Sequence, residues 1–151
     1  MPHIHEKIDF TAEVFIVHKN KVLLRKHDKH KVWLSVGGHI ELDEDPNQAA
    51  VREVEEEVGL KVKLAGEAMQ KGDIDYLELI PPKYLNRHKI NQTHEHVTLV
   101  YFATAENDEI IQPEREKSED IRWFSLEDLE KEKLRPNIKF YAQQALKELG
   151  D

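Results

Sequence analysis

The sequence predicts an α/β fold in which helices cover a mixed β-sheet. Two runs of β-branched and apolar residues, 12–18 and 21–25, are separated by two turn residues and predict a β-hairpin. Residues 96–104 give the strongest strand pattern in the chain. Helical patterns over residues 47–58 and 137–149 stand between and after these strands. Locally paired strands with helices at intervals favour a layered α/β architecture.

Shorter segments complete the expected order of elements. Further strands are predicted at residues 32–36, 60–65, 74–80 and 121–124. Polar loops are predicted at residues 83–93, which are basic, and 105–119, which are acidic. The strand at 32–36 is expected to end at Gly37-Gly38, and that at 74–80 at Pro81-Pro82. Ser125 is expected to cap a short helical turn.

The helix over residues 47–58 has clear start and stop signals. Pro46 stands at its beginning, Asp45 can serve as its N-cap, and Gly59 follows its last residue. Apolar residues form one stripe along it, namely Ala50, Val51, Val54 and Val58. The last helix repeats apolar residues at helical spacing, namely Ile138, Tyr141, Ala142, Ala145 and Leu149. Both helices are therefore expected to pack one face on the core.

Composition and charge limit the function classes. The 151 residues contain no repeat and predict one domain over residues 1–151. The net charge of −8 gives no general attraction to nucleic acid or to anionic membranes. The absence of cysteine excludes disulfides, cysteine-ligated zinc and cysteine nucleophiles. No apolar run is long enough for a membrane span and no signal peptide is visible, so a cytoplasmic protein is expected.

Three carboxylates share one edge of the helix after Pro46. With Glu53 set at zero, Glu57 lies at about 40° and Glu56 at about 300°. Like charges four residues apart repel, and anions near a helix C-terminus are disfavoured by the helix dipole. Arg52 can neutralise about one of these carboxylates, and the remaining charge suits Mg²⁺ or Mn²⁺. The alternative is an ordinary solvated helix face.

The full pattern around this helix is more specific than its charge. It runs from Gly38 through Glu44 to the segment Arg52-Glu53-Val54-x-Glu56-Glu57-x-Gly59-Leu60. Seven fixed positions at a usage of about 0.05–0.07 each make a chance match on the order of one in a hundred million per start position. This stretch, Gly38 to Leu60, resembles the Nudix box of the Nudix hydrolase superfamily. The resemblance implies an α/β/α sandwich with a mixed sheet and the Nudix loop–helix–loop.

The resemblance also implies an activity and a metal. Nudix hydrolases cleave nucleoside diphosphates linked to another moiety, or nucleoside triphosphates, by water attack on a pyrophosphate phosphorus. They use a divalent metal, which is expected here to be Mg²⁺, with Mn²⁺ possible. Matched position by position, the metal ligands would be Glu53, Glu56, Glu57 and the carbonyl of Gly37. The partner would be a small nucleotide substrate, and homodimers are common in the family.

The same matching assigns catalytic residues. Arg52 resembles the residue that orients Glu56, and Glu44 resembles the supporting carboxylate. The general base stays open, because relatives use either a glutamate of the box or one on a distant loop. The distant candidates are Glu114, Glu116 and Glu119, of which Glu116 is favoured, with Glu95 outside that loop. An acidic solvent loop is the alternative.

Histidines and one basic cluster are the remaining candidates. His39 follows the box glycine and is expected to contact substrate or to pack structurally. Arg87 and Lys89 flank His88 in the local basic cluster and are expected to meet distal phosphates, or else to solubilise a loop. His94 and His96 share an i,i+2 spacing, but a zinc site would need more ligands than the sequence places beside them.

Competing functions follow from the same resemblance. The first is the metal-dependent pyrophosphohydrolase. The second is a nucleotide-sensing Nudix-fold module that binds without turnover. The intact ligand positions argue against it, and 151 residues are not expected to leave room for the DNA-binding output domain that such a module usually needs. The third is isomerase chemistry on an isoprenoid diphosphate, which uses a cysteine that this chain lacks.

Overall fold

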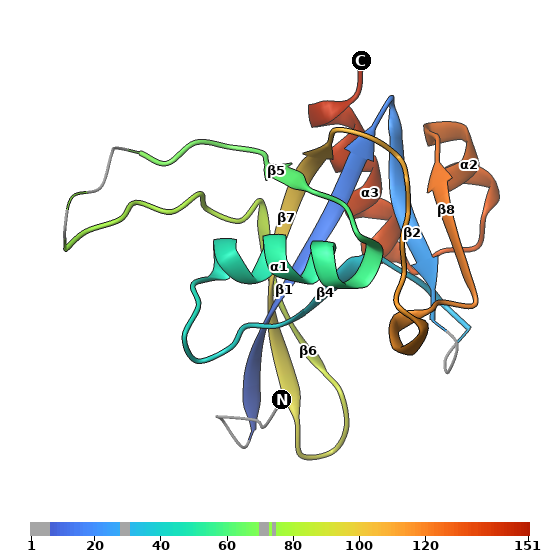
Figure 1. The fold of residues 1–151 in the computed structure, drawn as a ribbon. Helices are drawn as coiled ribbons and strands as arrows, with labels where there is room; N and C mark the ends of the chain where they lie inside the picture. Colours follow the sequence, from blue (N-terminus) through green and yellow to red (C-terminus); the bar gives the residue numbers. More distant parts are fainter. Residues whose placement is uncertain (1–6, 28–30, 70–72, 74) are drawn as a thin grey trace.

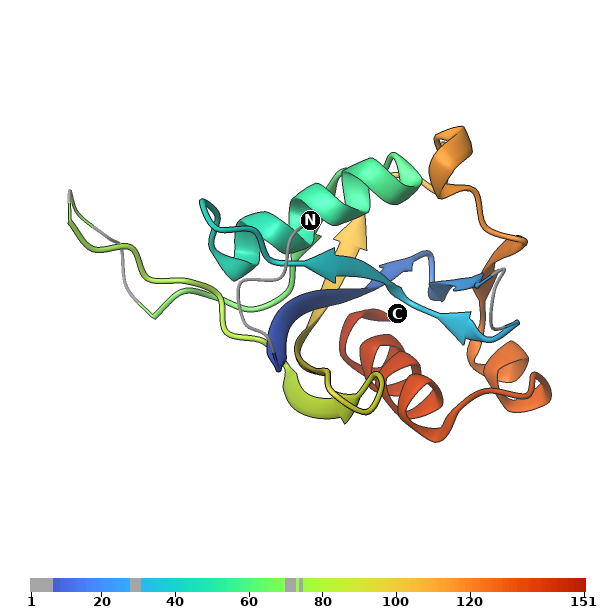
Figure 2. The same ribbon diagram turned by 90° about the horizontal axis from the view of Figure 1, so that it is seen from below.

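A sandwich of helices around a mixed sheet forms the architecture. The structure is a computed structural model that describes residues 7–27, 31–69, 73 and 75–151. Within these ranges the sheet has eight strands, and helix α1 lies on one face while α2 and α3 lie on the other (Figure 1 and Figure 2). This confirms the predicted α/β/α class. No helix in the described part of the chain is both long and apolar enough to cross a membrane.

The elements have the following bounds. The strands are β1 Ile8–His18, β2 Lys21–Lys26, β3 Trp33–Leu34, β4 Val36–His39, β5 Val62–Leu64, β6 Tyr84–Lys89, β7 Glu95–Ala105 and β8 Asp120–Phe124. The helices are α1 Pro46–Val58, α2 Leu126–Lys131 and α3 Pro136–Leu149, with a 3-10 turn at Glu114–Glu116.

Strand β1 is the centre of the sheet. It pairs in parallel with β7 along most of its length, from Ile8 opposite Glu95 to Val17 opposite Thr104. It pairs antiparallel with β2 and with β4, and β7 pairs antiparallel with β5 and β6. The predicted hairpin is confirmed, and its turn residues Lys19 and Asn20 have φ of 47° and 63°, the left-handed conformation that two-residue hairpin loops require.

Helix α1 begins and ends where its flanking residues require. The Asp45 side chain accepts from Gln48 N at 2.8 Å, and the Gln48 side chain accepts from Asp45 N, which satisfies two of the free N–H groups of the first turn. Gly59 ends the helix with φ of 70°, a conformation that costs glycine no side-chain clash. The predicted stripe packs on the sheet: Ala50, Val54 and Val58 are fully buried.

Two cores hold the layers together. The core on the α3 side contains Phe15, Phe102, Phe124, Tyr141 and Ala142. The core on the α1 side contains Val14, Ile16, Val54, Val58 and Tyr101. Neighbouring residues of β1 therefore serve opposite cores, as the two-residue period of a strand dictates. This alternation also decides which polar side chains of β1 share a face.

The segment after β5 was predicted wrongly. Residues 75–80 contain no strand, and position 74 lies outside the described residues. The side chain of Asn47 replaces a sheet partner, because its Nδ2 donates to Ile80 O at 2.9 Å and its Oδ1 accepts from Ile80 N at 2.8 Å. A side-chain amide thus satisfies backbone groups that the alternating pattern had assigned to a strand.

Two other predictions are corrected by strand pairing. The predicted loop at 83–93 contains β6, whose Tyr84 pairs with Val100 and packs its ring 5.3 Å from that of Tyr141. The apolar run at 32–36 does not end at Gly37-Gly38, since β4 continues to His39 along β1. In both cases a neighbouring strand supplies hydrogen bonds that outweigh weak local strand propensity.

Candidate active site

Arg52, in the middle of α1, is the centre of a charged network. Its Nε donates to Glu44 Oε2 at 2.9 Å and its Nη2 to Glu44 Oε1 at 2.6 Å, a bidentate pair. Its Nη1 donates to Glu53 Oε1 at 2.9 Å and to Glu56 Oε2 at 3.1 Å. Its Nη2 also donates to the carbonyl of His39 at 3.0 Å. One guanidinium therefore holds three carboxylates and the end of β4, more than the one carboxylate that charge counting suggested.

The same network sets the pKa values of its members. Hydrogen bonding to Arg52 lowers the pKa of Glu44, so Glu44 is ionised throughout the neutral range. Hydrogen bonding to Glu44 raises the pKa of Arg52, the reciprocal effect. The ion pair of Arg52 and Glu44 stays charged at neutral pH and fixes the loop between β4 and α1.

Glu57 is the buried carboxylate of the site. Its side chain is 6% exposed and its Oε2 lies 3.0 Å from Arg25 Nη2. The N–H of Gly37 donates to the same oxygen at 3.4 Å. Burial, together with the neighbouring Glu53 carboxylate, raises the pKa of Glu57 to about 8, although Arg25 opposes the shift. The folded site therefore favours the protonated form of Glu57 near neutral pH.

Gly37 and Gly38 let this charge approach the sheet. A Cβ on Gly37 would lie 2.1 Å from the carbonyl oxygen of Ala12, and a Cβ on Gly38 would lie 2.6 Å from Glu53 Oε1. At Gly37 a side chain would clash with the backbone of β1, so the close pairing of β4 with β1 requires glycine there. At Gly38 a side chain would displace the carboxylate of Glu53, which lies directly against the backbone of β4.

A cavity of about 230 Å³ opens beside these glycines. Its lining includes Arg25, Gly37, Gly38, His39, His88 and His96. Arginine, imidazole and backbone N–H groups are the donors that phosphate oxygens accept from. A larger cavity of about 570 Å³ lies next to it and is mostly apolar; His39 lines both.

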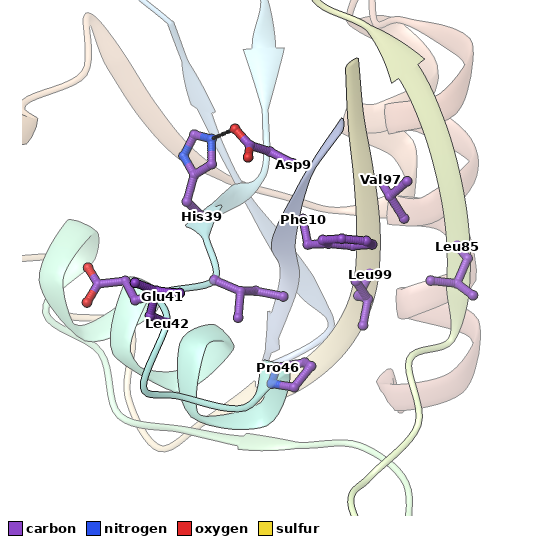
Figure 3. Close-up of a pocket in the computed structure, with 10 residues that line it drawn as sticks. Asp9, Phe10, His39, Glu41, Leu42, Pro46, Leu85, Val97 and Leu99 are labelled. Carbon is purple, nitrogen blue, oxygen red and sulfur yellow. Dashed lines mark ion pairs between the residues drawn. The ribbon is translucent and has the colours of Figure 1, made fainter. Parts of the chain in front are cut away.

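Figure 3 shows how the larger cavity is built. Phe10, Leu99 and Leu85 project into it from the strands, Pro46 closes it at the start of α1, and Asp9 points to His39 at one end. Burial lowers the pKa of His39, which keeps its imidazole neutral near pH 7.

The predicted residues outside the box are dispersed. Glu114 and Glu119 are exposed, and Glu119 Oε1 lies 2.7 Å from Lys31 Nζ. Glu116 ends the 3-10 turn, and its side chain lies outside what the structure describes. Arg87 is 63% exposed and has Glu95 at 3.8 Å, while Lys89 is exposed. Neither basic residue lines the two cavities beside His39.

Sequence reasoning missed Arg25 and Asp9. Arg25 ends the predicted strand 21–25, whereas Asp9 precedes the predicted strand 12–18 and was assigned to no element, because β1 begins earlier than predicted, at Ile8. A charged residue at the end of an apolar strand is the available signal for Arg25. Arg25 faces Glu57 across the site, and Asp9 faces His39 and His94.

Comparisons with known proteins agree with this geometry. The NUDIX domain family matches residues 9–144. A NUDIX-family hydrolase from Clostridium perfringens has a structure with TM-score 0.84 and 38% identity, covering 93% of this chain and 97% of that one. The MutT NUDIX hydrolase from Burkholderia pseudomallei shares the fold at TM-score 0.67 and 24% identity, covering 95% and 99% of the chains.

A curated relative carries a more specific name. A protein of Lactococcus lactis subsp. cremoris (strain MG1363) named a probable DHNTP pyrophosphohydrolase is 29% identical over 106 residues. The alignment covers 70% of this chain and spans 60% of that relative's length.

Proposed function

This chain belongs to the NUDIX domain family, and from that premise we propose that it is a divalent-metal-dependent pyrophosphohydrolase. Water attacks a phosphorus of the pyrophosphate bond in a nucleoside diphosphate derivative or a nucleoside triphosphate. The observation that carries the proposal is the network in which Arg52 holds Glu44, Glu53 and Glu56 next to buried Glu57. A helix face that served only solubility would not need this arrangement.

The donor set fits a hard divalent ion. Glu53, Glu56, Glu57 and the Gly37 carbonyl offer oxygen ligands, which Mg²⁺ and Mn²⁺ prefer. Burial, and after it the Glu53 carboxylate, raises the pKa of Glu57, and a cation bound beside Glu57 would favour its ionised form. When bound, the ion supplies Lewis-acid polarisation of the phosphoryl oxygens.

The residues of this chain do the positioning. Arg52 fixes the orientation of Glu53 and Glu56, and Glu44 in turn fixes Arg52. Arg25 contributes positive charge at the cavity floor, where phosphate oxygens would lie. The proton of the attacking water goes to a carboxylate oxygen, for which Glu53, Glu56 and Glu116 are the candidates.

The substrate would occupy the cavity beside Gly37-Gly38. We assign His39 a contact with substrate because its ring lines both cavities. Arg87 and Lys89 are assigned to distal phosphates as a proposal from the local basic cluster alone. The name of the Lactococcus relative makes DHNTP a compound to include beside the common nucleotides.

The test is a phosphate-release assay over diphosphate-linked compounds with and without MgCl₂. Glu56→Gln and Glu57→Gln are expected to lower turnover by about 10²–10⁴-fold, whereas Glu55→Gln, which alters an exposed residue of the same helix, should leave turnover unchanged. Wild-type activity in both variants would refute the metal assignment. Tight nucleotide binding in calorimetry without turnover at any divalent metal would instead favour a nucleotide-sensing module.

A further inference from the structure

A second group of metal-ligand side chains lies at the start of the two parallel strands. Asp9, His94 and His96 bring ligand atoms within 4.8 Å of one another, and they are the one such trio of His, Asp or Glu among the residues that the structure describes. The strand register explains the grouping. Asp9 is the β1 residue opposite His96 on β7, and His94 precedes His96 by two residues, so all three side chains share one face.

The distances are those of a pre-assembled ligand set. His94 Nε2 lies 3.0 Å from Asp9 Oδ2. In a tetrahedral zinc site with bonds of about 2.0 Å, neighbouring ligand atoms lie about 3.3 Å apart. The rings of His94 and His96 have centroids 5.2 Å apart. Small side-chain rotations would therefore bring all three ligand atoms to bonding distance of one ion.

The side chains of this trio are largely buried, which makes an ionised Asp9 energetically costly unless it is bound to a partner. The side chain of Asp9 is 5% exposed and that of His94 is 12% exposed. Burying a carboxylate is costly unless it is hydrogen-bonded or bound to a cation. A metal ion held between Asp9 and the two imidazoles would provide such an interaction.

The ligand atoms of Asp9, His94 and His96 differ in chemistry from those of the glutamates in the Nudix box. Two imidazole nitrogens and one carboxylate oxygen select borderline transition metals, whereas the glutamates of α1 offer oxygen alone. We propose that Asp9, His94 and His96 form a binding site for a divalent transition-metal ion of the Zn²⁺ class, separate from the carboxylates of α1.

Neighbouring groups support this site. His39 Nε2 lies 3.4 Å from Asp9 Oδ2, close enough to act as an outer-shell partner of the carboxylate (Figure 3). Three protein ligands leave a coordination position for water or a substrate atom. Asp9 lines the larger cavity and His96 the smaller one, so the ion would lie where the two cavities meet. It would also join the first residues of β1 to those of β7.

The experiment is a Zn²⁺ titration by calorimetry of the full chain after treatment with a chelator, in excess Mg²⁺. One Zn²⁺ per chain is expected. Asp9→Asn and His94→Gln should weaken binding by more than about 100-fold, since loss of groups that merely support metal ligands already costs up to that much. His18→Gln, which alters a histidine that bonds Ala105 at the other end of β1, should bind as the wild type does.

Further arms separate this site from the proposed active site. Glu56→Gln should keep the Zn²⁺ affinity, so failure of the enzymatic proposal and failure of this one give different results. Nitrogen NMR of the wild-type imidazoles needs no variant, and Zn²⁺ should shift His94 and His96 while leaving His18 unmoved. No Zn²⁺ binding by the wild type, or shifts confined to other histidines, would overturn the proposal.

Discussion

The carboxylate site on α1 and the histidine site at the start of β1 differ in how the chain assembles them. The first comes from residues 37–57, where helix geometry and one loop bring the ligands together. The second joins residues 85 or more positions apart through the register of two parallel strands. The first compensates its charge with Arg52 and Arg25, and the second pairs its carboxylate with imidazoles. A site built from neighbouring residues can be predicted from the sequence, whereas a site assembled by strand pairing cannot be recognised there.

The largest expected effect distinguishes the two sites by activity. Glu56→Gln or Glu57→Gln should lower kcat by about 10²–10⁴-fold, because each removes a charged oxygen from the reacting centre. Steady-state kinetics with Mg²⁺ measure this. His94→Gln should leave far more activity than either of these variants. Equal losses in all three variants would show that the two sites act as one.

The next effect tests Arg52 as the organiser of the first site. Arg52→Ala should lower the free energy of unfolding by about 2–3 kcal/mol, because several charge-assisted hydrogen bonds are lost and Glu44 stays half-buried. Denaturant unfolding measures the change. Arg52→Lys keeps the charge but not the planar fork, so it should recover part of the stability and little of the activity. A lysine variant indistinguishable from the wild type would mean that charge alone suffices.

A metal-linked stability change tests the second site. Zn²⁺ at a hundred times its Kd should raise the free energy of unfolding by about 2.7 kcal/mol. Thermal melting with Zn²⁺ and with chelator compares the two states. In Asp9→Asn the difference should vanish, while in Glu57→Gln it should persist. Stabilisation that survives the loss of Asp9 would place the ion elsewhere.

The smallest expected effect concerns pH and the buried carboxylate. Because the pKa of Glu57 is raised to about 8 in the folded chain, the folded state holds a proton that the unfolded state releases at lower pH. The stabilisation of the folded state by this bound proton is therefore present at acid pH and is lost as the pH rises towards 8. The groups facing Glu57 are Arg25 from β2, the Gly37 N–H from β4 and Glu53 of its own helix.

Unfolding in denaturant at pH 5 and pH 8, with a chelator present, measures this dependence. Glu57→Gln should show a smaller fall in stability between the two values than the wild type does. Parallel curves for the two proteins would indicate that Glu57 is ionised across the whole range.

The predictions of helices and strands divide in the same way: those that depend on neighbouring residues were correct, and those that depend on distant residues were wrong. Helix α1 was predicted to within a residue, because Asp45, Pro46 and Gly59 act on their immediate neighbours. Strand β6 was missed, because Tyr84 to Lys89 form a strand only beside β7. The strand expected at 74–80 is absent from the described residues there, because the Asn47 side chain binds Ile80 across 33 positions.

By itself the sequence determined the α/β class, the hairpin, the capped helix and the arc of Glu53, Glu56 and Glu57, since each depends on residues within a few turns of one another. Only the tertiary structure decided that Arg25 faces Glu57 and that Asp9 meets His94 and His96. Those contacts depend on which strands pair and in which register. Register is set by burial of whole strand faces, and no local pattern encodes it.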